Sequence, residues 1–373
     1  MRIELKRIGV IVKFDHIGIV GLGLIGGSIA RTLKSKDAAI RITVMSRNED
    51  ALAAALRDGV ADEVTSTDWS LFATCDAVFI CVPVDKIFEN AERLAHTVRR
   101  DCIITDVGSV KAPVMQAVAG LDLCFIGGHP MAGSEKSGYA ASVDYLFENA
   151  HYFLTPPENA HVYATEALRA LIARLGAIPV TMCAEQHDRI VAAVSHGPHI
   201  AAAALVNTVA ALDNSGGDLR TFSAGGFKDI TRIASSDGAL WRSICTENKL
   251  EVLSFLSMLQ EQIEAFRSGL ASGSELMLEG LFDRARDYRD SMSSSKRSKY
   301  ADAFLIHMDV PDRPGSIATV ATLLSANNIN IKNIGIVHNR EYHDGVLQIV
   351  LDSEDSRANA VTLLKEMNFK VYE

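Results

Sequence analysis

Residues 16–28 read HIGIVGLGLIGGS, and this stretch decides the fold of the first half of the chain. A β-branched run is followed by Gly21, Gly23 and Gly26 in a G-x-G-x-x-G pattern, which leads into a helical stretch beginning near Ser28. Glycines at this spacing allow a tight turn and let the backbone approach a pyrophosphate, and the start of the helix offers free N–H groups. The position directly after a strand predicts NAD(P) binding, with an ordinary strand–helix turn as the alternative.

The same alternation of strand and helix continues over residues 14–182. Runs such as RITVMSR, DAVFICVP and CIITDVG are separated by helical stretches such as EDALAAALRDG. This order predicts an α/β Rossmann-type fold, with a doubly wound and mostly parallel sheet. We therefore expect residues 14–182 to form an NAD(P)-binding domain.

The rest of the chain changes character twice. Residues 183–292 are helical, and runs such as AAAALVNTVAAL are apolar nearly all round, which is typical of a helix buried between subunits. We expect an all-helical substrate and dimerisation domain, and hence a homodimer. A serine- and lysine-rich linker follows at 293–301. Residues 302–373 have the order βαββαβ of a ferredoxin-like unit.

The composition limits the partners of the chain. Its 373 residues are 48% hydrophobic and 22% charged, and the net charge is −9, as in a soluble globular protein. No basic run suggests nucleic-acid binding. The cysteines are scattered without a C-x-x-C pair, which favours a reducing cytoplasm and argues against a zinc site. No apolar run reaches the length of a membrane span, so no membrane partner is expected.

Two further stretches bear on the cofactor. Ser46 and Arg47 follow the second predicted strand, where NAD enzymes usually carry Asp or Glu. A hydroxyl and a guanidinium there favour the 2′-phosphate of NADP, although Arg47 could also stack on adenine and leave NAD usable. Val82 and Pro83 follow the third strand, at the carboxyl edge where a parallel sheet binds its ligand.

GGHPMAGSE follows the fifth predicted strand, so His129 should stand at the same carboxyl edge. Pro130 forces His129 into an extended conformation, and the glycines around it leave room for a ligand. A catalytic role is favoured over that of an ordinary loop histidine. Ser109, in TDVGSVK after the fourth strand, should point at the nicotinamide region, with a helix-capping role as the alternative.

Two helical segments carry histidines and cations. His196 and His199 stand at the start of a helix in SHGPHIAAA, and no H-E-x-x-H motif or nearby cysteine supports a metal site. Lys228 and Arg232 lie one helical turn apart in GGFKDITRIASSD. Their apolar neighbours suggest a partly buried helix start, where two cations would need an anion such as a substrate carboxylate. A solvated basic face is the alternative.

Taken in order, the fingerprint, DVGSVK, GGHPMAGSE, SHGPH and GGFKDITRIA resemble the prephenate dehydrogenase family over roughly residues 16–290. The tail VPDRPGSIATVATLLSANNINIKNIGI resembles an ACT domain, a small-molecule regulatory module. The resemblance implies oxidative decarboxylation of prephenate to 4-hydroxyphenylpyruvate, with hydride transfer to NAD(P)⁺, in tyrosine biosynthesis. It also implies a helical dimerisation domain, and arogenate dehydrogenase is the alternative within the family.

The resemblance also implies roles for individual residues. His129 would accept the proton of the substrate hydroxyl, Ser109 would bond to that hydroxyl, and Arg232 would bind a carboxylate. His196 and His199 would line the substrate side. Further matching positions are Ser134 and Glu135 at the pocket mouth, and Lys228, Asp229, His187 and Trp241.

Some features depart from the family pattern or leave alternatives open. Gly197 stands where the family often has a bulkier residue, which bears on the choice between prephenate and arogenate. The loop from Asp312 to Gly315 would belong to an amino-acid pocket, which implies feedback inhibition by tyrosine. A 3-hydroxy-acid dehydrogenase would share the first two domains but release no CO₂. A non-catalytic sensor of NAD(P) and amino acid would bind without turnover.

Overall fold

The structure is a computed structural model that describes residues 2–5, 10–133, 136–213, 219–293, 304–311, 313–337 and 346–372. It divides into two compact units, Met1–Glu261 and Gln262–Glu373. The first unit contains a large sheet and most of the helical segment. The second contains the end of that segment and a small C-terminal sheet.

An eight-stranded sheet organises the first unit, in the order β10-β9-β8-β7-β6-β3-β4-β5. Its strands are β3 (His16–Val20), β4 (Arg41–Met45), β5 (Glu63–Thr65), β6 (Ala77–Ile80), β7 (Ile103–Asp106), β8 (Cys124–Pro130), β9 (His151–Thr155) and β10 (Ile178–Thr181). β3 to β8 pair in parallel, whereas β9 runs antiparallel to β8 and parallel to β10. The predicted mostly parallel sheet is confirmed. The sequence analysis missed β5, β10 and a hairpin of β1 (Arg2–Leu5) and β2 (Val10–Lys13).

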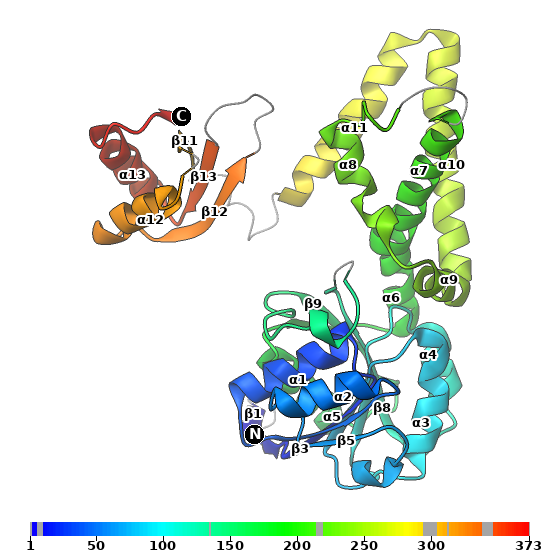
Figure 1. Cartoon of the computed structure of the whole chain (residues 1–373). Coiled ribbons are helices and arrows are strands. Elements are labelled where there is room, and N and C mark those ends of the chain that lie inside the picture. The colour runs from blue at the N-terminus through cyan, green and yellow to red at the C-terminus, as the bar shows by residue number, and fades with distance from the viewer. Residues whose placement is uncertain are drawn as a thin grey trace. The chain divides into compact units, whose positions relative to one another are not determined.

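Helices cover both faces of this sheet (Figure 1). They are α1 (Leu24–Lys36), α2 (Glu49–Arg57), α3 (Ile87–Ala95), α4 (Ala112–Val118) and α5 (Val162–Arg174), with short turns η1 (Trp69–Phe72), η2 (Val84–Lys86) and η3 (Tyr139–Ala141). Leu33 of α1, Leu52 of α2 and Leu168 of α5 belong to one buried core. Leu94 of α3 and Val114 of α4 belong to another. Two cores on opposite faces are the arrangement that a doubly wound sheet requires.

The helical segment follows β10. Its elements are α6 (Ala184–Val191), the π-helical turn η4 (Ala192–His196), α7 (Gly197–Asp213), α8 (Gly225–Thr231), η5 (Arg232–Ser235), α9 (Gly238–Glu247), α10 (Lys249–Ser272) and α11 (Glu275–Ser293). α7 is less buried within the chain than its composition suggests, and Leu212 is 60% exposed. An exposed apolar helix of this kind is typical of a protein–protein interface.

The continuous helix over residues 184–213 is an exception to the expectation that no run is long enough for a membrane span. By length and composition alone, this helix could cross a membrane. One such helix is weak evidence, because an interface or core helix of a soluble protein has the same composition. The polar contacts described below join its first part to the eight-stranded sheet.

The C-terminal sheet confirms the predicted βαββαβ order. Its elements are β11 (Leu305–Asp309), α12 (Ser316–Ala326), β12 (Ile331–Val337), β13 (Val346–Leu351), α13 (Glu354–Glu366) and β14 (Val371–Tyr372). The strands pair antiparallel in the order β12-β13-β11-β14 around a core that includes Met308, Val320 and Leu364. Asp312 and all but the first residue of the expected linker lie outside the described residues.

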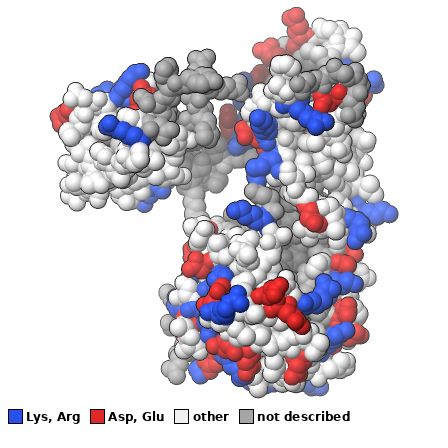
Figure 2. All heavy atoms as spheres, in the orientation of Figure 1, with Lys and Arg blue, Asp and Glu red and all other residues white. Residues whose placement is uncertain are grey.

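Charges of both signs are interspersed on the visible face of the molecule (Figure 2). Among the side chains coloured there, Lys and Arg lie next to Asp and Glu over much of the visible surface. Among the described residues, this view therefore shows no broad basic patch.

Candidate functional site

The turn after β3 has the backbone of a dinucleotide site. Gly21 has a φ of +101°, and a Cβ there would come within 2.3 Å of the Cys81 carbonyl oxygen. A Cβ on Gly26 would come within 2.1 Å of the Gly21 oxygen. Gly23 instead faces open space and begins α1 without a side-chain cap. The free N–H groups of the helix start therefore fit a pyrophosphate.

A cleft of about 900 Å³ opens beside this turn. Its walls include the predicted cofactor residues Gly21, Gly23, Ser46, Arg47, Val82 and Pro83. Gly26 lies behind the turn rather than in the wall. The helical segment supplies the other side through Asp237, Ala239, Leu240, Arg242 and Ser243 of α9 and its cap. The sequence analysis named Trp241 of this helix as a family position but did not place α9 beside the cofactor.

The end of β4 presents polar groups to the cleft. Ser46 Oγ accepts a hydrogen bond from the Asn48 backbone N–H at 3.2 Å, and Asn48 in turn caps α2. Arg47 is exposed. A hydroxyl and a guanidinium thus stand where a carboxylate would repel a 2′-phosphate.

His129 lies within β8, which corrects the expectation that it follows the strand. It pairs with Phe153 of β9 and is only 7% exposed. The extended backbone that Pro130 imposes is therefore part of the sheet. His129 still stands at the carboxyl edge, two strands from β6, on the edge that carries the glycine turn.

The glycines before His129 do not leave room for a ligand, contrary to expectation. A Cβ on Gly127 would come within 2.3 Å of Thr155 Oγ1, and one on Gly128 within 2.5 Å of the Asp106 carbonyl oxygen. These positions are glycine because neighbouring protein atoms fill the space. Gly133, after the strand, does face open space.

A buried ion pair holds the end of β8. Asp106 Oδ1 accepts the Gly128 N–H at 3.0 Å, while Lys111 Nζ donates to the Gly128 carbonyl at 2.8 Å and to Asp106. β7 ends at Asp106, so these two side chains take the place of a neighbouring strand for Gly128. Burial lowers the pKa of Lys111, and the charge of Asp106 opposes this. The backbone beside His129 is therefore fixed by charges.

His129 also begins a chain of polar contacts into α6. Its Nδ1 lies 2.8 Å from His187 Nε2, and His187 Nδ1 lies 2.7 Å from Asp188 Oδ1. The Asp188 carboxylate also accepts the backbone N–H groups of Lys111 and Ala112, at 2.7 and 2.8 Å. Burial lowers the pKa of His129 and of His187. Both imidazoles are therefore neutral near pH 7.

A second histidine group lies on η4 and the start of α7. His196 is 1% exposed, and its Nδ1 lies 3.1 Å from Asn248 Nδ2. His199 stacks on the Trp241 ring, with centroids 3.7 Å apart, and the same ring meets His196 edge-on. Burial lowers the pKa of His196 to about 4. Burial, and then the charge of Arg232, lower the pKa of His199.

The predicted cations are more exposed than expected. Lys228 and Arg232 are both exposed, and Ile230 between them is 64% exposed. The prediction that these cations lie at a partly buried helix start is therefore wrong for the single chain. The effect of Arg232 on His199 places these two groups within electrostatic range.

The remaining predicted residues divide into described and undescribed positions. Ser109 is half-buried in the loop after β7. Ser134 and Glu135 lie outside the described residues. Within the described part of the chain, no group of three or more His, Cys, Asp or Glu side chains is arranged to hold a metal ion.

Gly197 is buried against an aromatic ring. A Cβ on Gly197 would come within 2.2 Å of the ring of Phe255 in α10. Phe255 thus fills the space that a bulkier residue at position 197 would occupy. The glycine consequently does not enlarge the site at this point.

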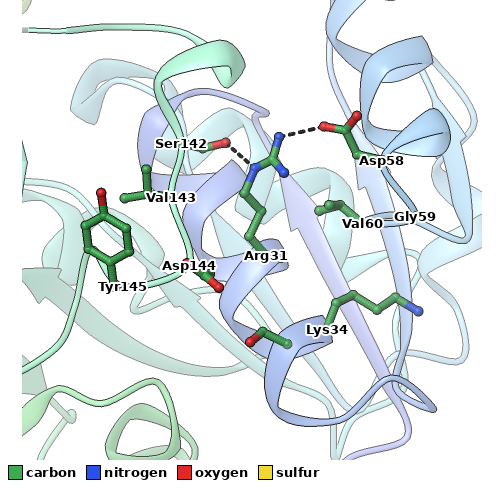
Figure 3. Close-up of a pocket in the computed structure, with 10 residues that line it drawn as sticks. Arg31, Lys34, Asp58, Gly59, Val60, Ser142, Val143, Asp144 and Tyr145 are labelled. Atoms are coloured by element: carbon green, nitrogen blue, oxygen red, sulfur yellow. Dashed lines mark hydrogen bonds and ion pairs between the residues drawn. The ribbon is translucent and has the colours of Figure 1, made fainter.

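A second hollow, of about 510 Å³, lies beside α1 (Figure 3). Arg31 in its wall donates to Asp58 at 2.7 Å and to Ser142 at 2.9 Å, and Lys34 pairs with Asp62. Because both cations are already paired, these contacts join α1 to its neighbours and do not mark a ligand site.

Sequence reasoning missed the residues that hold the histidines. Asp106, Lys111, Asp188 and Asn248 are buried polar groups whose partners lie far away in the chain. Asp106 and Lys111 stand within the TDVGSVK motif, which was the one available signal.

Comparison with known proteins assigns the nucleotide-binding and helical parts of the chain to one family. Residues 29–180 match the family described as prephenate dehydrogenase, nucleotide-binding domain. Residues 183–283 match prephenate dehydrogenase, dimerization domain. The helix over residues 184–213 therefore belongs to a dimerisation domain.

Individual relatives are similar over most of their length. Prephenate dehydrogenase of Bacillus subtilis is 38% identical over 93% of this chain and 94% of its own. The crystal structure of prephenate dehydrogenase from A. aeolicus, in complex with hydroxyphenyl propionate and NAD⁺, is 31% identical with a TM-score of 0.72, covering 75% of this chain and 99% of that one. Synechocystis arogenate dehydrogenase is 30% identical with a TM-score of 0.66, covering 74% and 99%. The chain belongs to the prephenate dehydrogenase family.

Proposed function

We propose that the chain catalyses the oxidative decarboxylation of prephenate to 4-hydroxyphenylpyruvate, with hydride transfer to NAD(P)⁺. The observation that carries the proposal is the placement of His129. This histidine is buried, neutral and fixed at the carboxyl edge of the sheet that also carries the dinucleotide turn. Membership of the family supports the choice of substrate.

The chemistry needs a proton acceptor and anion-binding groups. Prephenate carries a ring hydroxyl, a ring carboxylate and a pyruvyl side chain. Bound NAD(P)⁺ would accept hydride from the carbon that bears the hydroxyl, while the ring carboxylate departs as CO₂. His129 would take the hydroxyl proton as a general base, and Ser109 would hydrogen-bond to the same oxygen.

Cationic and polar groups on the helical side would hold the substrate. Arg232 would bind a carboxylate through its guanidinium, with Lys228 as a second cation. His196 and His199 would line the substrate side, next to Trp241. Ser134 and Glu135 are proposed for the pocket mouth.

The choice of cofactor is a separate proposal. Ser46 and Arg47 favour NADP, because together they can bind a 2′-phosphate. The A. aeolicus relative was crystallised with NAD⁺. NAD therefore stays the alternative for this chain.

The ferredoxin-like C-terminal sheet suggests regulation. We propose that it is an ACT domain and that tyrosine inhibits the enzyme through it, at the loop that ends at Gly315. Initial rates that do not change at millimolar tyrosine, or after deletion of residues 301–373, would contradict this. A homodimer formed through the helical domain and a cytoplasmic location complete the proposal.

One assay tests the function. Initial rates would be measured with prephenate and with arogenate, each with NAD⁺ and NADP⁺, with and without tyrosine. We expect prephenate turnover with release of CO₂. Preference for arogenate would identify the alternative activity within the family, and reduction of cofactor without CO₂ would indicate a 3-hydroxy-acid dehydrogenase. Binding without turnover would indicate a sensor.

A further inference from the structure

Asp188 contacts two separate histidine systems through two different groups. Its carboxylate accepts from His187 Nδ1 at 2.7 Å, and its backbone carbonyl accepts from Asn248 Nδ2 at 2.9 Å. An ionised carboxylate and a carbonyl can accept hydrogen bonds but cannot donate them. Both contacts therefore fix which atom of the partner carries a proton.

The Asp188 carboxylate determines which ring nitrogens of His187 and His129 carry a proton. Two backbone N–H groups donate to the Asp188 carboxylate, so His187 must donate to it from Nδ1–H. The Nε2 of neutral His187 is then an acceptor, and it lies 2.8 Å from His129 Nδ1. His129 must donate from Nδ1–H, which leaves its Nε2 unprotonated.

The Asp188 backbone carbonyl determines how the Asn248 amide is oriented, and thereby which ring nitrogen of His196 carries a proton. The Asn248 amide must turn its nitrogen toward the Asp188 carbonyl, because its own oxygen would face that acceptor unfavourably. The same amide nitrogen lies 3.1 Å from His196 Nδ1, so this ring atom accepts. The proton of neutral His196 is then on Nε2.

We propose that Asp188 and Asn248 are positioning residues that hold the two histidines in opposite tautomers. His129 presents an unprotonated Nε2 that accepts the hydroxyl proton. His196 presents an Nε2–H that donates to a carboxylate or carbonyl oxygen of the bound substrate. The role of the substrate in this statement rests on the proposed function.

An unpartnered buried atom points to the ligand. His196 Nε2 is buried and has no hydrogen-bond partner among the described residues. A buried donor without a partner is costly, so such a group in a native fold needs an explanation. An oxygen of a bound substrate would satisfy it. His129 and His196 are also close enough for one to lower the pKa of the other.

Burial keeps both rings neutral. The tautomer therefore determines which nitrogen of each ring donates a hydrogen bond and which accepts one. The pKa of His196 is lowered to about 4 and that of His129 lies well below the usual value, in both cases mainly through burial. A neutral imidazole carries one donor and one acceptor. Fixing one ring nitrogen therefore fixes the other.

Nitrogen NMR on the full-length protein tests the tautomers directly. The protein would be labelled with ¹⁵N-histidine, assigned by single substitutions, and measured near pH 7.5 by long-range ¹H–¹⁵N correlation. We expect the proton on Nδ1 in His129 and on Nε2 in His196. A proton on Nδ1 of His196, or on Nε2 of His129, would overturn the proposal.

Asn248→Asp tests the positioning role. A carboxylate at this position would accept from His196 Nδ1–H, so the proton should leave Nε2 and KM for prephenate should rise about tenfold or more. The ring of His129 should keep its tautomer. Asn327→Asp in α12 is the matched control, because that amide also donates to a backbone carbonyl but contacts no histidine. If His196 keeps its Nε2 proton in the folded Asn248→Asp variant, Asn248 does not set the tautomer.

Asn248→Ala covers the case in which the carboxylate variant fails to fold. It removes the donor without adding charge, and we expect His196 to populate both tautomers. A single Nε2–H form in this variant would again contradict the role of Asn248. The NMR result does not depend on turnover. A protein with these tautomers that does not act on prephenate would leave the tautomer assignment in place and remove the proposed function.

Discussion

Lys111 and Asp106 form an ion pair in which both side chains are wholly shielded from solvent, and both contact Gly128, the residue before His129. Removing charges from water is costly, so such a pair is tolerated only where further hydrogen bonds satisfy it. Here the backbone of β8 supplies those bonds. The position of the proposed base thus depends on two buried charges. If one were removed, water could not reach the other to solvate it.

Lys111→Met should destabilise the fold by about 3–5 kcal/mol, because it leaves the Asp106 carboxylate buried without its counter-ion. Urea unfolding would measure the loss. Lys36→Met is the control: Lys36 pairs with Glu148 at the surface, and this change should cost at most about 1 kcal/mol. Equal losses in the two variants would contradict the structural role of the buried pair.

His129→Asn should lower kcat by about 10² to 10⁴, as expected for loss of a general base, while cofactor affinity stays largely unchanged. Steady-state kinetics and cofactor titration would separate the two effects. His151→Asn, an exposed histidine on the adjacent strand β9, should leave kcat unchanged. Activity of His129→Asn within a few-fold of the original would show that another group accepts the proton.

Arg232→Gln should raise KM for prephenate strongly, by about 10-fold or more, because a charge-assisted hydrogen bond to a carboxylate is lost. KM for the cofactor should not move. Arg174→Gln, at the exposed end of α5, serves as the control. A variant that loses kcat and keeps KM would indicate a role in the chemical step instead of in binding.

Acid should destabilise the protein through its buried histidines. Burial lowers the pKa of His129, His187 and His196 in the folded state, so the unfolded chain binds their protons first as the pH falls below about 6.5. Stability is therefore full above this pH and falls below it. For His196 alone, with a pKa of about 4, the loss should reach roughly 2 kcal/mol by about pH 5. Urea unfolding of the original and of His196→Asn across this range would measure it, and equal slopes would contradict the assignment.

Gly197→Leu should destabilise the fold and reduce activity, because the new side chain would overlap the ring of Phe255. The double variant Gly197→Leu/Phe255→Ala should recover much of the loss, since the leucine then takes the space of the ring. Thermal unfolding of both single variants and of the double variant would give the coupling. Additive losses would show that the two positions are independent.

The parts of the fold that local pattern determines could be predicted from the sequence. The glycine turn and the long β-branched runs identify the sheet, because their hydrophobic pattern is a local property. β5 (Glu63–Thr65) and β10 (Ile178–Thr181) are short and only half-buried, so their sequences carry little of that signal. The exposed apolar surface of α7 in the single chain fits the prediction, made from its apolar composition, of a helix buried between subunits.

The site divides in the same way. Ser109 follows β7 and His129 lies near the end of β8, and both belong to motifs that can be identified in the sequence. The contacts that hold the histidine groups could not be predicted, because Asn248 lies 52 residues from His196 and Asp188 lies 77 residues from Lys111. The glycines of GGHPMAGSE show the limit most clearly. Their spacing indicates backbone freedom but not whether a ligand or a neighbouring side chain uses the space.

The crowding of Gly127 and Gly128 has a consequence for how this enzyme can diversify. Neither position accepts even a methyl group without displacing Thr155 or the backbone of Asp106. The two positions before the proposed base are therefore closed to side chains. Gly133 instead faces open space, so we expect substrate preference to change more readily there than at Gly127 or Gly128.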